Sequence, residues 1–474
     1  MQNSNTVIRF RVSGRALSRT AALATLALAA GTVGAQTAPP PLPTVAENPN
    51  QLSMARAITV VCPNLRTQYR STGGNMPSDQ IALFDACAGV VRADSGDQSR
   101  SNALQELTGE ELNAAQTTSV DFGGMQRANI AARLMTLRQA RGSSAVAALS
   151  PQDLNIVGIS TGGAAGDGDG SALGGRLGLF LNGRIGSGSK DTTDLEAGYD
   201  VDTTGLTAGA DYRINEQAVV GAAFSFGNTD ADFDNNSLGL SGGTFESDGY
   251  SLALFASWSG ERSYFDAIAS YGQMDHESRR RISYTLSIPD DPDLGANVTE
   301  TWDATARGDT ESDMFSIGAS YGYDFGNGPW RYGPILAINY LEVSVDGFAE
   351  KGAPGLELTY GDQDGDSLQL QAGLDVAYTA GMSWGVLSPH ARFIYVNEQM
   401  NDSQVIDLRY SSDPLGAVFG VRSDDPDQDF FRWGVGLSAL FANGFAAFID
   451  YDAVLSLETV DYGELTVGLR YSFQ

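Results

Sequence analysis

The last stretch of the chain, residues 464–473, alternates between apolar and polar side chains. Leu465, Val467, Leu469, Tyr471 and Phe473 fall on one face of a strand, and polar or small residues fall on the other. Residues 431–441 and 445–455 repeat this period and are rich in aromatic residues. Strands with one apolar and one polar face are typical of barrels that meet lipid outside and enclose a polar lumen. The pattern therefore predicts a membrane β-barrel.

The same period predicts the number of strands and their connections. Twelve strands begin near Arg176, Gly205, Ala218, Tyr250, Tyr264, Met314, Gly333, Leu368, Trp384, Phe431, Phe445 and Glu464. Connections after even-numbered strands are tight, whereas most after odd-numbered strands are long and acidic, as at residues 291–311 and 403–428. This asymmetry is typical of bacterial outer-membrane barrels whose short turns face the periplasm.

The predicted fold class is therefore all-β, a twelve-stranded transmembrane antiparallel β-barrel over residues 173–474. A small α-helical N-terminal module and a pore helix precede it. A β-sandwich or a soluble barrel is the alternative for alternating strands. The regular exchange of short and long connections, together with a secretory signal, argues against that alternative.

Residues 1–35 have the pattern of a secretory signal peptide. Four arginines precede an apolar run over residues 21–30, and Val33-Gly34-Ala35 supplies small residues for cleavage. The apolar run is too short to span a bilayer. We expect these residues to be removed and the rest of the chain to enter an oxidising compartment.

Residues 36–124 form the expected helical module. Apolar residues recur at helical spacing over residues 51–91 and again over 104–119. Cys62 and Cys87 are the two cysteines of the chain, and in the periplasm an isolated pair most simply forms a disulfide. Two cysteines with no histidine nearby argue against a metal site. We expect no metal and no cofactor.

Residues 125–172 comprise a helix, 125–141, and a linker rich in Ser, Gly and Asp. The chain has 58 acidic residues and a formal net charge of −29, yet the helix carries four arginines and no acid. These are Arg127, Arg133, Arg138 and Arg141.

The overall acidity argues against nucleic acid as a partner. It suits loops near cations held by lipopolysaccharide, although it equally favours simple solubility.

Over residues 104–474 the order of motifs resembles that of the monomeric (type Va) autotransporters, the proteins of type V secretion. The resemblance rests on Glu110-Glu111-Leu112, Leu134-Met135-Thr136-Leu137-Arg138, Tyr264-Phe265-Asp266-Ala267, Tyr271-Gly272 and Leu469-Arg470-Tyr471-Ser472-Phe473. It implies that the assembly machinery reads the closing strand through Leu469, Tyr471 and Phe473. It also implies a helix threaded through the barrel.

Alternation along the strands turns six acids into the lumen, where charges need partners. They are Asp211, Asp266, Asp375, Asp450, Asp452 and Glu464. We expect the arginines of residues 125–141 to neutralise them. Two alternatives stay open: the arginines form a solvated face, or residues 144–159 fill the lumen instead.

The expected function is an autotransporter-type barrel that inserts in the outer membrane and displays its short module at the cell surface. Expected partners are outer-membrane lipid and lipopolysaccharide, the barrel assembly machinery and periplasmic chaperones, with a monomeric barrel. The alternative is a structural or pore-forming barrel whose module stays periplasmic. The cysteine pair favours this alternative, because a disulfide-tied bundle is bulky for a pore.

The sequence predicts no enzymatic activity. His276 and His390 are the two histidines of the chain, and residues 36–141 contain none. This excludes Ser-His-Asp and Cys-His catalysis within those residues. Asp275-His276 near the fifth strand is interpreted as a polar pair. Asn129 has no neighbouring Asn, so the resemblance gives no support for passenger release by asparagine cyclisation.

Overall fold

The computed structural model describes residues 41–93, 97–112, 130, 134, 176–235, 238–239, 241–288, 298–326, 328–400, 403–441 and 445–472. The expected signal peptide, the linker, Phe473 and the four arginines of residues 125–141 lie outside the described residues.

Twelve strands close into one antiparallel ring. They are β1 (Leu177–Lys190), β2 (Tyr199–Arg213), β3 (Ala218–Asn235), β4 (Ser241–Ser259), β5 (Ser263–Ile288), β6 (Val298–Tyr323), β7 (Trp330–Val345), β9 (Gln363–Tyr378), β11 (Gly385–Glu398), β14 (Asp429–Phe441), β15 (Phe445–Leu455) and β16 (Val460–Ser472). Each pairs with the next in this order, and β16 pairs back onto β1. The twelve-stranded barrel predicted from alternation is confirmed.

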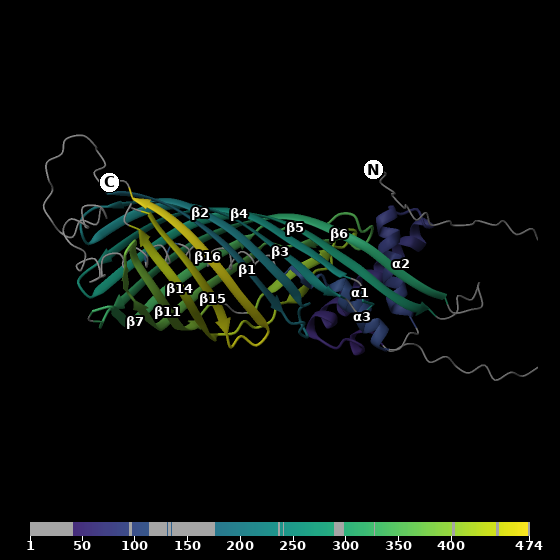
Figure 1. Cartoon of the computed structure of the whole chain (residues 1–474). Helices are drawn as coiled ribbons and strands as arrows, with labels where there is room; N and C mark the ends of the chain where they lie inside the picture. Colours follow the sequence, from purple (N-terminus) through teal and green to yellow (C-terminus); the bar gives the residue numbers. More distant parts are fainter. Residues whose placement is uncertain are drawn as a thin grey trace, which may run out of the picture. The chain divides into compact units, whose positions relative to one another are not determined.

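The two ends of the barrel differ as the connections predict. At the short-turn end, β2, β4, β6, β9 and β14 each run into the next strand through a brief link, and Gly178 of β1 pairs with Ser472 of β16. The first strand therefore begins, and the last one ends, at this short-turn end. Figure 1 shows the C-terminus there, away from the far ends of β5 and β6.

At the opposite, extended end, several strands are longer than alternation predicts. The predicted starts of β2 at Gly205, β4 at Tyr250 and β6 at Met314 are too late by several residues. Residues 291–311, expected as a loop, include the first part of β6, which pairs with β5 as far as Ile288. Apolar residues of these outer segments, such as Tyr284, pack towards the helices, and none of their described large apolar side chains is exposed. Backbone pairing therefore continues where the lipid-facing apolar signal has stopped.

A second, three-stranded sheet also stands at the extended end. Its strands, β8 (Leu358–Tyr360), β12 (Val405–Tyr410) and β13 (Phe419–Arg422), pair in the order β13-β12-β8. They lie in the connections between β7 and β9 and between β11 and β14. The expected loop over residues 403–428 is thus partly a sheet. A short strand, β10 (Ala380–Met382), pairs with the start of β11 at the short-turn end.

The outer wall of the barrel is apolar at mid-height and aromatic at its rims. Leu254 on β4, which is 62% exposed, lies midway between the exposed Tyr250 and Trp258. Trp258 pairs with Phe265, which pairs with Tyr321, and all three rings are exposed. Two aromatic rows around an aliphatic band mark the two interfaces of a bilayer.

Three α-helices precede the barrel: α1 (Pro49–Thr72), α2 (Ser78–Arg92) and α3 (Asp97–Thr108), with 3₁₀ turns η1 (Leu42–Thr44) and η2 (Glu110–Leu112). Asn48 caps α1 by accepting from the backbone N–H of Gln51, and Gly73 ends it in the left-handed region. The helices lie at the extended end, next to β5 and β6 (Figure 1). Among the described helices, none is both long and apolar enough to cross a membrane.

Replacing Leu254 by Arg should cost about 2–4 kcal/mol of unfolding free energy, because the charge would lie near the middle of the lipid-facing band. Denaturant unfolding in lipid vesicles measures this change. Leu254→Ile is the matched control and should unfold with the wild type. Equal stability of the Arg and Ile variants would show that this face does not meet lipid.

Candidate functional site: the barrel lumen and the extended end

The inner wall carries paired charges that cross an intervening strand. His390 and Arg392 on β11 reach Asp450 and Asp452 on β15, at 2.5 Å for His390 Nε2 to Asp450 Oδ1 and 2.5 Å for Arg392 Nη2 to Asp452 Oδ2. Strand β14 lies between β11 and β15, and the β14 residues that these two side-chain pairs cross are both glycines. A buried ion pair is stable when its charges also gain hydrogen bonds, as Arg392 does through Nε to Asp452 at 2.9 Å.

Gly434 and Gly436 of β14 make these crossings possible. Gly434 stands in register with Arg392 and Asp452, and Gly436 stands in register with His390 and Asp450. A Cβ at Gly436 would strike the carboxylate of Asp450 and the ring of His390. The two glycines therefore leave a flat path along which side chains two strands apart can meet.

Other predicted lumen acids also find partners on the barrel itself. Glu464 pairs with Arg184, and Asp211 lies 3.5 Å from Arg470. Asp266 accepts a hydrogen bond from Ser257 at 2.6 Å. Asp375 lies opposite Arg392 in the pairing of β9 with β11.

All six acids are buried or half-buried. The barrel thus supplies a basic partner to four of them, through Arg184, His390, Arg392 and Arg470. The alternation assigned this neutralisation to the arginines of residues 125–141 and did not identify these four residues as partners of the acids. The signal was present, because each of the four sits at a lumen-facing position of its strand. A role for Arg127, Arg133, Arg138 and Arg141 stays a prediction.

Two residues of the predicted pore helix are described, and both lie inside the barrel. Ile130 and Leu134 are helical and 0% exposed. They pack in one cluster with inward-facing side chains of β1, β3 and β4: Phe180, Val219, Ala223, Ala253 and Phe255. Phe180 and Val219 lie near the short-turn end of their strands, so Ile130 and Leu134 lie in that half of the lumen.

The helices share one hydrophobic core with the extended end. Met54, Ile58 and Leu65 of α1 belong to the same buried cluster as Ile406 and Leu408 of β12. The cluster also takes in Ile282, Tyr284 and Leu286 near the end of β5. Trp302 of β6 packs partly buried against it, facing Gly89 of α2.

A buried ion pair lies where α3 meets the barrel extension. Arg280 on β5, 2% exposed, donates to both carboxylate oxygens of Glu350, at 2.9 and 2.7 Å. It also donates to the backbone carbonyl of Glu106 on α3 at 3.3 Å. The carboxylate of Glu106 in turn accepts from the backbone N–H of Ser283 at 3.1 Å. Charge and backbone polarity are thus matched across the contact.

The two glutamates of η2, Glu110 and Glu111, have raised pKa values at this contact. Burial and the neighbouring Glu111 raise the pKa of Glu110 well above its ordinary value. Burial raises the pKa of Glu111 to about 7, against the opposing attraction of Arg280. A carboxyl group with a raised pKa favours the folded state when protonated, so ionisation of Glu111 weakens the contact as the pH rises from about 4.5 towards 7.

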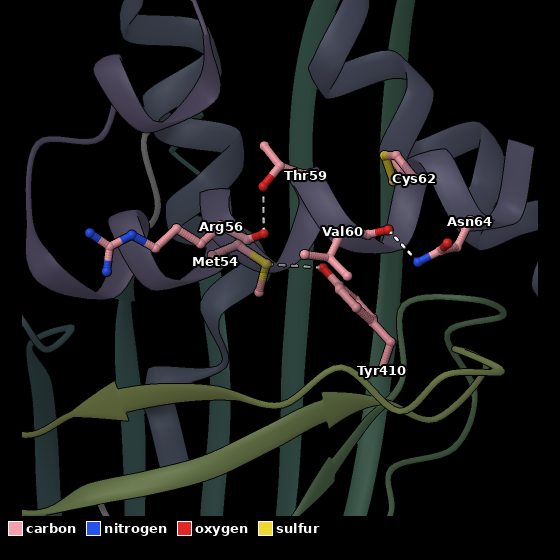
Figure 2. The surroundings of a disulfide bond; sticks show 8 residues. Met54, Arg56, Thr59, Val60, Cys62, Asn64 and Tyr410 are labelled. Atoms are coloured by element: carbon pink, nitrogen blue, oxygen red, sulfur yellow. Dashed lines mark hydrogen bonds between the residues drawn. A yellow bond between two sulfur atoms is a disulfide. The ribbon is translucent and has the colours of Figure 1, made fainter.

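The disulfide joins α1 to α2 close to the second sheet. Cys62 and Cys87 are bonded, with their Cα atoms 5.8 Å apart. Figure 2 shows Tyr410 of β12 pointing towards Met54 of α1, with 3.4 Å between the hydroxyl and the sulfur. Arg56, on the same helix, extends away from Tyr410. In the described residues, no group of three or more His, Cys, Asp or Glu side chains is placed to hold a metal ion.

The closing strand presents its apolar residues to the outside. Leu469 and Tyr471 of β16 are exposed, whereas Glu464 and Thr466 between β15 and β1 are buried. This facing matches the alternation along the strand. Recognition of Leu469, Tyr471 and Phe473 by an assembly machinery stays a prediction.

A closed barrel with an apolar belt, aromatic rims and internally paired charges defines an integral β-barrel protein of the bacterial outer membrane. Residues 179–452 match the family described as Autotransporter beta-domain. The chain belongs to the autotransporter family.

Relatives and solved structures show how far this likeness extends. Esterase EstA of Pseudomonas aeruginosa is 28% identical over 262 residues, which cover 53% of this chain and 36% of that protein. Outer membrane protein A of Rickettsia conorii is 25% identical over 268 residues, 56% of this chain and 12% of that protein. The translocator domain of NalP from Neisseria meningitidis has a TM-score of 0.45 at 17% identity, covering 63% of this chain and 89% of that one.

The match to proteins named Esterase EstA contradicts the expectation that the chain is not an enzyme. That expectation is wrong, because its argument from histidine content covered only part of the chain. The lack of histidine in residues 36–141 excludes histidine-dependent catalysis only there, and His276 and His390 lie elsewhere in the chain. The chain spans about a third of the length of these esterases, since the match covers 36% of each.

Replacing Gly436 by Val should destabilise the barrel by about 3 kcal/mol, because the new side chain separates His390 from Asp450 and leaves a buried carboxylate unpaired. Val435→Leu, on the lipid-facing side of the same strand, is the control and should change little. The temperature at which the folded band converts to the unfolded band on a denaturing gel measures both. Identical conversion temperatures would show that the crossed pair adds nothing.

Proposed function

We propose that this protein is an autotransporter-type barrel that displays its own helical module at the cell surface. The helical module here means the expected residues 36–124, of which residues 41–112 are described apart from 94–96. The observation that carries the proposal is the path of the chain. The module contacts the extended end, Ile130 and Leu134 lie in the lumen, and β1 begins at the short-turn end.

This path has a direction in the membrane. Short turns of outer-membrane barrels face the periplasm and the longer connections face outwards. A module that contacts β5, β12 and β13 beyond the bilayer-spanning band is then outside the cell. A module left in the periplasm would meet the short-turn end instead, so the same contacts speak against the structural or pore-forming alternative.

The partners follow from this role. Outer-membrane lipid contacts the exposed aliphatic band, and lipopolysaccharide surrounds the outer aromatic rim. We expect the barrel assembly machinery to recognise the closing strand through Leu469, Tyr471 and Phe473, after periplasmic chaperones have delivered the unfolded chain. The exposed side chains of Leu469 and Tyr471 support this expectation.

An epitope inserted between Gly74 and Asn75 tests display, because this turn between α1 and α2 is exposed at Gly73 and Asn75. Antibody should label intact cells, and permeabilising the outer membrane should add little signal. A second epitope between Asn215 and Glu216, in the turn after β2, is the matched control and should be labelled only after permeabilisation. Labelling of the Gly74 epitope only after permeabilisation would establish the periplasmic alternative.

Ester hydrolysis is a second candidate function, favoured by the likeness to proteins named Esterase EstA. His276 is the candidate residue because its ring nitrogens lie 2.7 Å from the Ser247 hydroxyl and 2.8 Å from the Ser312 hydroxyl. Purified protein in detergent should hydrolyse p-nitrophenyl butyrate, and His276→Ala should abolish this. Activity that survives the substitution removes His276 from the mechanism, and no activity in the wild type dismisses the candidate.

A further inference from the structure

We propose that the extended end of the barrel is the folding template and the permanent anchor of the helical module. The surface concerned consists of β8, β12 and β13 together with the outer parts of β5 and β6, and is called the docking sheet below. The proposal rests on the proposed function, since the module must first reach that end. It adds that the module completes its fold there and stays bound.

The module completes its core only against the docking sheet. A three-helix bundle of fewer than about 80 residues has a small core that rarely supplies more than about 3–5 kcal/mol. Here the buried residues of α1 and α3 pack against the docking sheet as well as against each other. Ile406, Leu408 and Tyr410 of β12 are each no more than 5% exposed, and they would face solvent if the module were absent.

The polar contacts are equally specific. Strand β13 is an edge of its sheet, and unpaired edge groups invite aggregation. Asn50 of α1, 1% exposed, occupies that edge: it donates to the Arg422 carbonyl at 2.9 Å and accepts from the Arg422 N–H at 2.7 Å. Two residues along the same edge, the Gly420 N–H donates to the Ser53 hydroxyl at 3.1 Å. Side chains of α1 thus take the place of a neighbouring strand.

Asn50 also joins this edge to a second connection of the barrel. Its amide donates to the Leu195 carbonyl, between β1 and β2, at 2.9 Å. One buried side chain therefore holds α1, β13 and the β1–β2 connection together. Removing the Asn50 side chain from the docked state would leave three buried backbone groups without partners, which is costly away from water.

The same contacts resolve how a disulfide-tied module can be displayed through a twelve-stranded pore. A chain whose core is completed by the docking sheet has no stable fold before it arrives there. It can then pass the lumen as an extended segment and form the helices beside the sheet. The bond between Cys62 and Cys87 closes on helices that lie against Tyr410 and Leu356, so docking brings the two cysteines together.

A pair of substitutions on one strand tests the anchor in the full-length protein on intact cells. Ile406→Asp places a charge in the shared core, whereas Val405→Asp places the same charge on the opposite, 56% exposed face of β12. External protease should cleave the module of Ile406→Asp about tenfold faster than that of the wild type, since cleavage follows the undocked population. Val405→Asp should match the wild type.

Three readouts on the same cells separate the outcomes. Heat-dependent gel mobility reports whether the barrel has folded, and the Gly74 epitope reports display. A folded barrel with a labelled epitope and unchanged protease resistance in Ile406→Asp would overturn the anchor while leaving display intact. An unlabelled epitope in the wild type would instead overturn the proposed function.

A second pair leaves the barrel strands unaltered, in case Ile406→Asp prevents barrel folding. Asn50→Ala removes the three hydrogen bonds to the docking sheet and the β1–β2 connection. Asn64→Ala, on the same helix, removes a bond to its own helix, from Asn64 Nδ2 to the Val60 carbonyl at 2.8 Å. The first should release the module to protease and the second should not. Equal resistance of the two variants would refute anchoring through this contact.

Discussion

The backbone of a membrane-spanning segment has no water to bond with, and the rest of this structure follows from that constraint. Every strand that crosses the hydrocarbon must find a partner on both sides, so the sheet has to close. Here β16 returns to β1 over 13 paired positions, from Lys190 with Val460 to Gly178 with Ser472. Antiparallel closure over twelve strands puts the start of the first strand and the end of the last strand at the same, short-turn end.

Closure also creates a confined interior in which charges cannot remain unpaired. The barrel meets this demand with pairs such as Arg392 with Asp452, which cross β14 over its glycines. Because Gly434 and Gly436 have no side chains, residues of β11 and β15 can meet across β14, although these two strands do not hydrogen-bond to each other. The apolar cluster around Ile130 and Leu134 shows that other parts of the lumen are filled by packing instead.

Beyond the membrane the constraint relaxes, and the strands continue as soluble structure. Strands β5 and β6 extend as a hairpin, and β8, β12 and β13 add a small sheet whose edge and apolar face need cover. The helical module supplies that cover, with Asn50 bonded to the β13 edge and Arg280 bonded to the Glu106 carbonyl of α3.

The sequence alone determined the barrel, its twelve strands and its two unlike ends. Period-two alternation and turn length are local properties, so they can be read from short stretches of the chain. It also determined the pairing of Cys62 with Cys87, since the chain has no other cysteine. Only the tertiary structure decided where the charges pair, because Arg392 and Asp452 are 60 positions apart and meet through register across a third strand. It likewise decided that the long connections hold a sheet and that the module docks there. Those segments are polar outside and apolar only towards the helices, and no local pattern reveals a partner that lies hundreds of residues away.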